Sequence, residues 1–220
     1  MNLIDEHSLY RTVTNAAMFL FDDGTLTTAH KARVANWILA RQNHQQGFVF
    51  YPTASDLKTG ITLFSGEKPK TKLLANNAVE LETLRLLALI QPESSSVQQV
   101  FQTANERLAG LCFADMCDTG ECAHASIAYL RYLTAADPDG SAAKITRALG
   151  ILKRHRAGDG RWHKFPFFFV LLWLTELPND LARAELTYAA GRAAGLSTGQ
   201  EHLPVRQKIL DKVLARTNRH

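Results

Sequence analysis

Apolar residues recur at helical spacing over much of the chain, and turns rich in polar residues or glycine interrupt the pattern. Residues 3–21 form the first such segment, and Gly24 follows it in the way that a glycine commonly ends a helix. Thr27 or Thr28 can cap the next helix, which we expect to run to about Arg41. The pattern therefore predicts two helices joined by a short turn at the start of the chain.

A weak internal repeat comes next. The end of a helix, four spacer residues and a glycine recur three times with the same spacing. The three copies are residues 38–42 with Gly47, residues 111–115 with Gly120, and residues 151–155 with Gly160. This recurrence predicts that the chain is built from repeated units.

An apolar segment follows each of these glycines and is dense enough in apolar residues for a largely buried helix. The three segments are residues 73–90, 122–133 and 165–177. Each unit is predicted to be a helical hairpin, and because one hairpin cannot bury both faces of its helices, neighbouring hairpins must stack. We expect a single all-α domain over residues 1–220, with a small excursion of short extended segments and turns near residues 48–72.

The composition is that of an ordinary globular protein, with 46% hydrophobic and 21% charged residues. The apolar run 165–174 is too short to cross a bilayer, so no membrane span is expected. Residues 1–6 carry neither a basic region nor a cleavable apolar stretch, and the chain has three cysteines, an odd number that does not suit a closed disulfide framework. We therefore expect a cytoplasmic protein.

The net charge of +4 arises mainly near the end of the chain, where five basic residues face Asp211 as the opposing charge. They are Arg206, Lys208, Lys212, Arg216 and Arg219. Their spacing is typical of a solvated last helix whose cations suit the negative end of the helix dipole. Binding of nucleic acid is not predicted.

The repeated unit resembles the α/α-toroid proteins, a superfamily that includes protein prenyltransferase β-subunits and squalene-hopene cyclases. The resemblance rests on a helix that ends in Leu-x-x-Gln, a Gly-Phe or Gly-Trp turn and an apolar helix. The matching residues are Ile38-Leu39 with Gln42 and Gly47-Phe48, Leu86-Leu87-Ala88-Leu89, Ile151-Leu152 with Asp159-Gly160-Arg161-Trp162, and Leu171-Leu172-Trp173-Leu174. Because complete toroids contain more hairpins, the resemblance implies a shortened or open version.

The resemblance also implies a zinc site, since the protein prenyltransferases hold zinc with an Asp-x-Cys pair and a later histidine. Asp115, Cys117 and His163 match these ligands in kind and order. Thiolate, carboxylate and imidazole form a reasonable ligand set for zinc. Cys122 and His124 lie close enough in sequence to serve as alternative ligands, and so does Glu121.

A structural role for the cysteines is the alternative. Cys112, Cys117 and Cys122 are five residues apart, a spacing that does not place them on one face of a helix. On this interpretation they are small buried side chains of the core.

The aromatic stretch 162–169 could line a pocket for an apolar or isoprenoid-like ligand. The candidate binding residues there are Asp159, Trp162, His163 and Phe167. The alternative is that these rings fill the space between hairpins, as aromatic runs usually do in repeat proteins.

Two classes of function follow from these observations. In the first, the chain binds a small apolar ligand in its concave face and, if it is an enzyme, is a prenyltransferase-like transferase. In the second, it is a non-catalytic scaffold that uses the same face for a protein or peptide partner. Terpene cyclisation is not expected, because the aspartate-rich motif of the cyclases is absent from the sequence.

Overall fold

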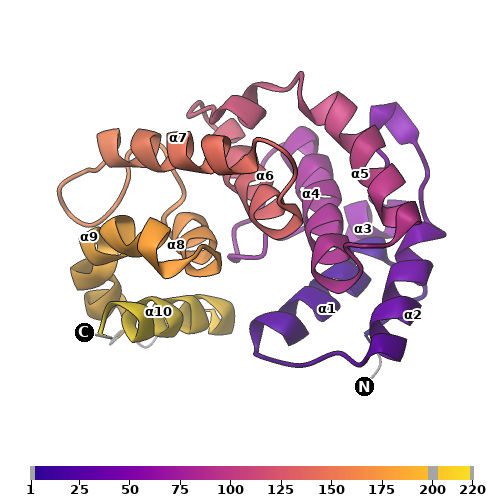
Figure 1. Cartoon of the computed structure of the whole chain (residues 1–220), viewed down its shortest axis with the longest axis horizontal. Coiled ribbons are helices and arrows are strands. Elements are labelled where there is room, and N and C mark those ends of the chain that lie inside the picture. Colours follow the sequence, from indigo (N-terminus) through magenta and orange to yellow (C-terminus); the bar gives the residue numbers. More distant parts are fainter. Residues whose placement is uncertain (1–2, 198–202, 219–220) are drawn as a thin grey trace.

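The computed structural model describes residues 3–197 and 203–218, and within them it contains ten α-helices and no β-strand. The helices are α1 (Leu9–Phe21), α2 (Thr28–Leu39), α3 (Ala54–Thr59), α4 (Lys72–Ile90), α5 (Ser95–Leu108), α6 (Cys122–Ala136), α7 (Ser141–Arg154), α8 (Phe167–Glu176), α9 (Asn179–Ser197) and α10 (Pro204–Thr217). The prediction of an all-α fold is confirmed (Figure 1). None of these helices is both long enough and apolar enough to cross a bilayer.

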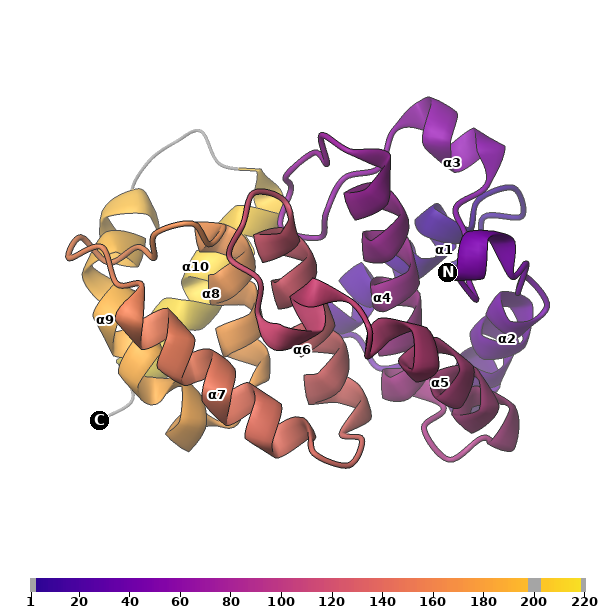
Figure 2. The ribbon, with the colours of Figure 1, turned by 90° about the horizontal axis from the view of Figure 1, so that it is seen from above.

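The three predicted apolar segments are the helices α4, α6 and α8. In the middle of the molecule α4 packs against α6, and α6 packs against α8 (Figure 2). The preceding helices α2, α5 and α7 pack on this row, since α2 and α5 contact α4 while α7 contacts α6. The first turns of α1 and α4 begin at Ser8 and Thr71, whose side chains accept hydrogen bonds from the backbone as N-caps. A shortened or open toroid arrangement of these hairpins stays a prediction.

The glycines of the repeat adopt the conformation that only glycine takes easily. Gly47, Gly120 and Gly160 have φ values of 82°, 52° and 84°. The middle copy differs from the prediction, because α5 already ends at Leu108 and a short 3₁₀ helix, η2 (Cys112–Asp115), occupies the position expected for a helix end. The turn glycines are therefore common to the three units, whereas the helix end before Gly120 is not.

The excursion between α2 and α4 contains a helix that the sequence analysis missed. Thr53 and Asp56 form a capping box at the start of α3, in which each side chain accepts a hydrogen bond from the other residue's backbone. After α3, the segment 60–66 covers the inner face of the helix row. Ile61 and Phe64 line a cavity of about 30 Å³ together with residues of α1, α4, α6 and α8. That volume admits about two water molecules, so little space is left among these side chains.

The basic residues of α10 are not simply solvated. Arg216 donates to the backbone oxygens of Leu174, Thr175 and Leu177, which are free carbonyls at the end of α8. Lys208 contacts Asp22 at 2.6 Å. The expectation of a solvated last helix is therefore wrong for Arg216, whereas the side chain of Lys208 is 44% exposed in its ion pair. Arg219 lies outside the described residues.

A buried ion network joins the three central helices. Arg131 on α6 contacts Glu82 on α4 at 2.7 Å and Glu176 on α8 at 2.7 Å, and Arg85 on α4 contacts both carboxylates as well. Burial alone would raise the pKa of Glu82, yet Arg131 and Arg85 hold it below its usual value. The side chain of Arg131 is fully buried, so its charge depends on these partners.

We predict that Arg131→Met lowers the free energy of unfolding by about 3–5 kcal/mol, because it leaves two carboxylates of the buried network without their main partner. Denaturation by urea measures the loss. Arg147→Met is the matched control, since Arg147 is exposed and lies 3.7 Å from Asp115, and it should cost less than about 1 kcal/mol. Equal losses in the two variants would contradict a structural role for the network.

We predict that Gly160→Ala destabilises the protein more than Gly158→Ala. Both glycines have positive φ, so both variants carry the strain of the left-handed region, about 1–2 kcal/mol. A β-carbon at position 160 would also lie 2.7 Å from Cβ of Arg192, whereas one at position 158 would meet nothing within 4 Å. Thermal unfolding of both variants checks the difference, and a smaller loss for Gly160→Ala would rule out a tightly packed third turn.

Candidate metal centre

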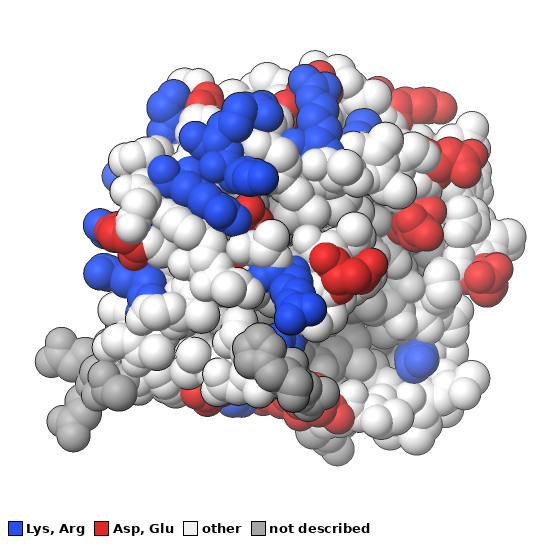
Figure 3. All heavy atoms as spheres, turned by 60° about the vertical axis from the view of Figure 1, so that its left-hand side comes forward, with Lys and Arg blue, Asp and Glu red and all other residues white. Residues whose placement is uncertain are grey.

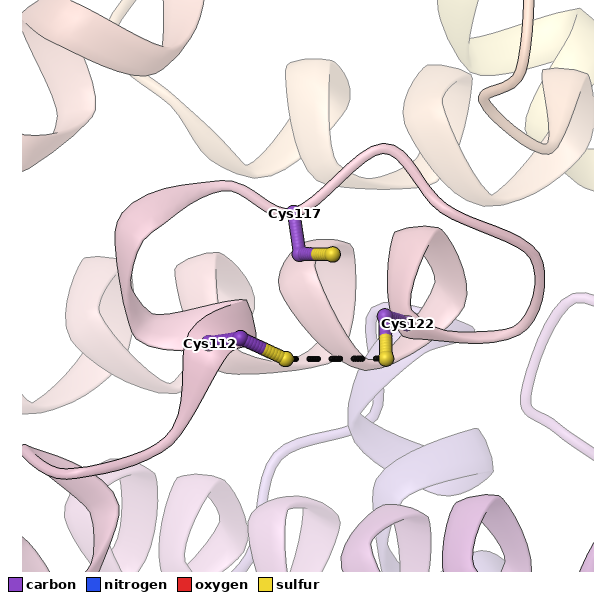
Figure 4. A group of neighbouring side chains, drawn as sticks. All are labelled: Cys112, Cys117 and Cys122. Atoms are coloured by element: carbon purple, nitrogen blue, oxygen red, sulfur yellow. Dashed lines mark hydrogen bonds between the residues drawn. The ribbon is translucent and has the colours of Figure 1, made fainter.

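Three cysteine side chains converge beside the start of α6. Their sulfur atoms all lie within 4.8 Å of one another, and the Cys112 thiol donates to the sulfur of Cys122 at 3.7 Å (Figure 4). Cys112 belongs to η2, Cys117 to the following loop and Cys122 to the first turn of α6. The site is therefore made by one continuous segment of eleven residues, 112–122.

The backbone of this segment explains why a spacing of five residues brings the cysteines together. Met116 and Gly120 have φ values of 64° and 52°, so the chain reverses its direction on either side of Cys117. Ser126 holds the loop against α6 by donating to the backbone oxygen of Cys117 at 2.9 Å. A spacing of five residues separates side chains on a straight helix, but residues 112–122 form a short 3₁₀ helix, a loop and the start of α6.

The cysteines are not buried residues of the core, so that interpretation of the sequence is wrong. Cys112 is exposed, and Cys117 and Cys122 are half-buried. A hydrogen bond from the backbone of Thr119 lowers the pKa of the Cys117 thiol. Burial raises the pKa of the Cys122 thiol to about 11. The surroundings of Cys117 and Cys122 therefore shift the pKa values of their thiols in opposite directions.

The three sulfurs lie close enough together to bind a metal ion. A zinc–thiolate bond measures about 2.3 Å, and a tetrahedron with such bonds has edges of about 3.8 Å. The observed distance of 3.7 Å between Cys112 and Cys122 matches such an edge. Thiolates are also the ligands that soft and borderline metals prefer. In the described part of the chain no His, Asp or Glu joins this group, so the described residues supply three donors.

The ligand set implied by the resemblance is not assembled. Of Asp115, Cys117 and His163, only Cys117 belongs to the cluster. The Asp115 side chain is 72% exposed and faces Arg147 at 3.7 Å. His163 is exposed, and its backbone N–H donates to His155. The sequence analysis missed this group because it looked for one aspartate, one cysteine and one histidine, whereas the fold brings three cysteines together.

The alternative ligands have separate outcomes. Cys122 belongs to the cluster, while His124 points elsewhere on α6 and burial lowers the pKa of its ring. Glu121 is already used, because its carboxylate accepts hydrogen bonds from the backbone N–H groups of Lys70 and Thr71. Cys112, which the sequence analysis left out of the ligand set, replaces these residues. The spacing of five residues gave no signal for it, because the cysteines meet through the turn at Met116.

An apolar groove adjoins the cysteine cluster between the first turns of α4 and α6. It has a volume of about 260 Å³, and Cys122 lies in its wall. The other lining residues are Thr71, Leu73, Leu74, Asn77, Phe113, Glu121 and Ala125. Leu73 in this wall is 65% exposed. The groove therefore offers apolar surface within reach of a sulfur of the cluster.

The aromatic stretch before α8 is packed between elements. Trp162 is 3% exposed, and its indole N–H donates to Glu185 at 2.9 Å. The rings of Phe167 and Tyr188 lie 6.1 and 5.8 Å from it. Asp159 forms an ion pair with Arg161 at the surface. This agrees with core packing for Trp162, while ligand binding by Asp159, Trp162, His163 and Phe167 stays a prediction.

The side of the molecule formed by α7, α9 and α10 carries both signs of charge. Lys and Arg side chains gather at the upper left of Figure 3, with acidic side chains between them. Arg156, for example, contacts Glu185 at 2.7 Å, and Lys164 contacts Asp118 at 2.9 Å. Pairing of this kind weakens the attraction that a basic surface exerts on a polyanion.

Comparison with known proteins adds no family. No protein-family model matches the chain, and no curated protein and no solved structure is significantly similar to it. The α/α-toroid resemblance therefore rests on the residues quoted for it.

Proposed function

We propose that this chain is a zinc-binding helical protein that takes a small apolar ligand beside its metal centre. The observation that carries the proposal is the convergence of the three cysteine sulfurs within 4.8 Å, with Cys122 also in the wall of an apolar groove. Cys112, Cys117 and Cys122 would hold the ion. With three protein donors, a bound zinc ion supplies a Lewis-acid position for a water or a ligand.

The surrounding residues prepare the site. The hydrogen bond from Thr119 favours the thiolate form of Cys117, which is the form that binds metal. Ser126 fixes the loop on α6, and Glu121 ties the same loop to the residues before α4. These contacts hold the three sulfurs near their binding positions, so that little order is lost when a metal binds.

The groove sets the class of ligand. Leu73, Leu74, Phe113 and Ala125 give it an apolar wall. Its volume of about 260 Å³ is many times the space that one water molecule needs. A short branched hydrocarbon such as an isoprenoid unit fits these dimensions. Whether the ligand is a substrate depends on chemistry at the metal.

We predict that untagged protein purified without chelator contains close to one zinc per chain. Cys112→Ser, Cys117→Ser and Cys122→Ser should each lose most of this zinc and melt at a lower temperature, because metal binding stabilises the folded state. Elemental mass spectrometry of the metal, together with thermal unfolding, measures both effects.

Asp115→Asn and His163→Gln are the matched controls, since the resemblance implies these ligands and the structure leaves them outside the cluster. They should keep the zinc of the wild type. Loss of zinc in these two variants with full retention in Cys112→Ser would overturn the three-cysteine centre in favour of the ligand set implied by the resemblance.

We predict that geraniol, a ten-carbon isoprenoid alcohol, shifts the backbone NMR signals of Leu73, Phe113 and Ala125 in a titration. Leu73→Thr should weaken its binding about fivefold, because the variant removes about 1 kcal/mol of apolar contact. Leu181→Thr is the control, since Leu181 is an exposed leucine on α9 that does not line this groove.

The titration also separates the competing sites. Shifts confined to Trp162 and Phe167 would move the ligand to the aromatic stretch and contradict the groove. An absence of shifts at saturating geraniol would contradict an apolar ligand and favour the scaffold function.

A further inference from the structure

We infer that Cys112 and Cys122 form an oxidation site at which a hydroperoxide closes a disulfide bond. The two sulfurs lie 3.7 Å apart, and their side chains point toward one another from η2 and from the first turn of α6 (Figure 4). This goes beyond the proposed function, because it assigns the thiols a covalent chemistry of their own.

The distance to be closed is small. A disulfide bond measures about 2.05 Å, so each sulfur has to move by about 0.8 Å. Rotation about the side-chain bonds of an exposed residue supplies such a movement, and Cys112 is exposed. The segment between the two cysteines contains Met116 and Gly120 at positive φ and is a loop rather than a rigid helix. The backbone therefore does not hold the sulfurs apart.

Access also favours this pair. Cys112 is the most exposed of the three cysteines, and a small oxidant can reach its sulfur from solvent. Cys122 lies next to it as the resolving thiol, the arrangement that converts a sulfenic acid into a disulfide before it is oxidised further. Cys117 remains as the third thiol of the cluster.

The reaction balances with a hydroperoxide as the oxidant. The Cys112 thiolate attacks hydrogen peroxide, the O–O bond breaks, and the sulfur keeps one oxygen as sulfenic acid while the other oxygen takes a proton and leaves as water. The sulfur of Cys122 then attacks the sulfenic sulfur, the S–O bond breaks, and a second water leaves with the proton of Cys122. Two thiols and one peroxide thus give one disulfide and two waters.

Oxidation would also empty the metal centre, a consequence that rests on the proposed function. The disulfide uses two of the three sulfurs that would hold the ion, so Cys117 alone remains as a donor. Zinc release should therefore equal disulfide formation, one ion for each bond. Reduction by a thiol reverses the bond and restores the three donors.

The sequence allows the three cysteines to be separated by proteolysis, so that the disulfide partners can be identified by peptide mapping. Asp115 and Asp118 lie between successive cysteines, so a protease that cleaves before aspartate places Cys112, Cys117 and Cys122 on three separate peptides. Full-length protein freed of metal is treated with hydrogen peroxide, blocked with N-ethylmaleimide and digested. We expect the peptides of Cys112 and Cys122 to be joined, Cys117 to be alkylated, and the intact chain to lose two hydrogens before alkylation.

Cys117→Ser is the matched control and should still form the disulfide at a similar rate. Cys112→Ser and Cys122→Ser should not form it, and circular dichroism shows whether these variants are folded. Three free thiols after oxidation of the folded wild type, or sulfinic acid at Cys112 without a joined peptide, would overturn the inference. A bond between Cys117 and either partner as the main product would overturn it as well.

The same treatment of zinc-loaded protein separates the two proposals. If the wild type takes up no zinc but forms the disulfide, the metal centre fails and the oxidation site stands. If zinc is bound and peroxide neither releases it nor joins the peptides, the metal centre stands and the oxidation site fails.

Discussion

The burial of Arg131 is the constraint on which the rest of the structure depends. A fully buried guanidinium needs carboxylates from outside its own helix, and it finds Glu82 on α4 and Glu176 on α8. Apolar contacts are not directional, so by themselves they would constrain the relative positions of α4, α6 and α8 only weakly. The ion pairs of Arg131 with Glu82 and Glu176 form only when the three helices are correctly aligned along their axes. The ion pairs connect α4, α6 and α8, the three helices of the central row.

Much of this fold could be predicted from the pattern of apolar residues. The segments 73–90, 122–133 and 165–177 are dense in apolar residues and correspond to α4, α6 and α8, because helices of this composition have to be covered on every side. The turn glycines could be predicted for the same kind of reason, since a chain that reverses at Gly160 needs a residue that tolerates positive φ. What the pattern could not give is the pairing of Arg131, because nothing local distinguishes a buried arginine from a solvated one.

The candidate site shows the complementary limit. Helical spacing argued that Cys112, Cys117 and Cys122 do not share a face, and this is true of a helix. Met116, an ordinary side chain, adopts positive φ at the C-cap of η2, and no propensity indicates such a residue. The cysteines meet because of that turn. The resemblance to a family implied metal binding by a thiolate, but it placed two of the donors at Asp115 and His163, which lie outside the group of three sulfurs.

Glu121 gives the loop a second connection whose consequence reaches beyond the cysteines. Its carboxylate binds the N–H groups of Lys70 and Thr71, immediately before α4, while its own backbone precedes Cys122 and the start of α6. The Glu121 side chain thus links the start of α4 to the start of α6. A rearrangement of the loop that carries the sulfurs would therefore alter the hydrogen bonds from the amides of Lys70 and Thr71 to Glu121. These two amides would then exchange their hydrogens with solvent at a different rate.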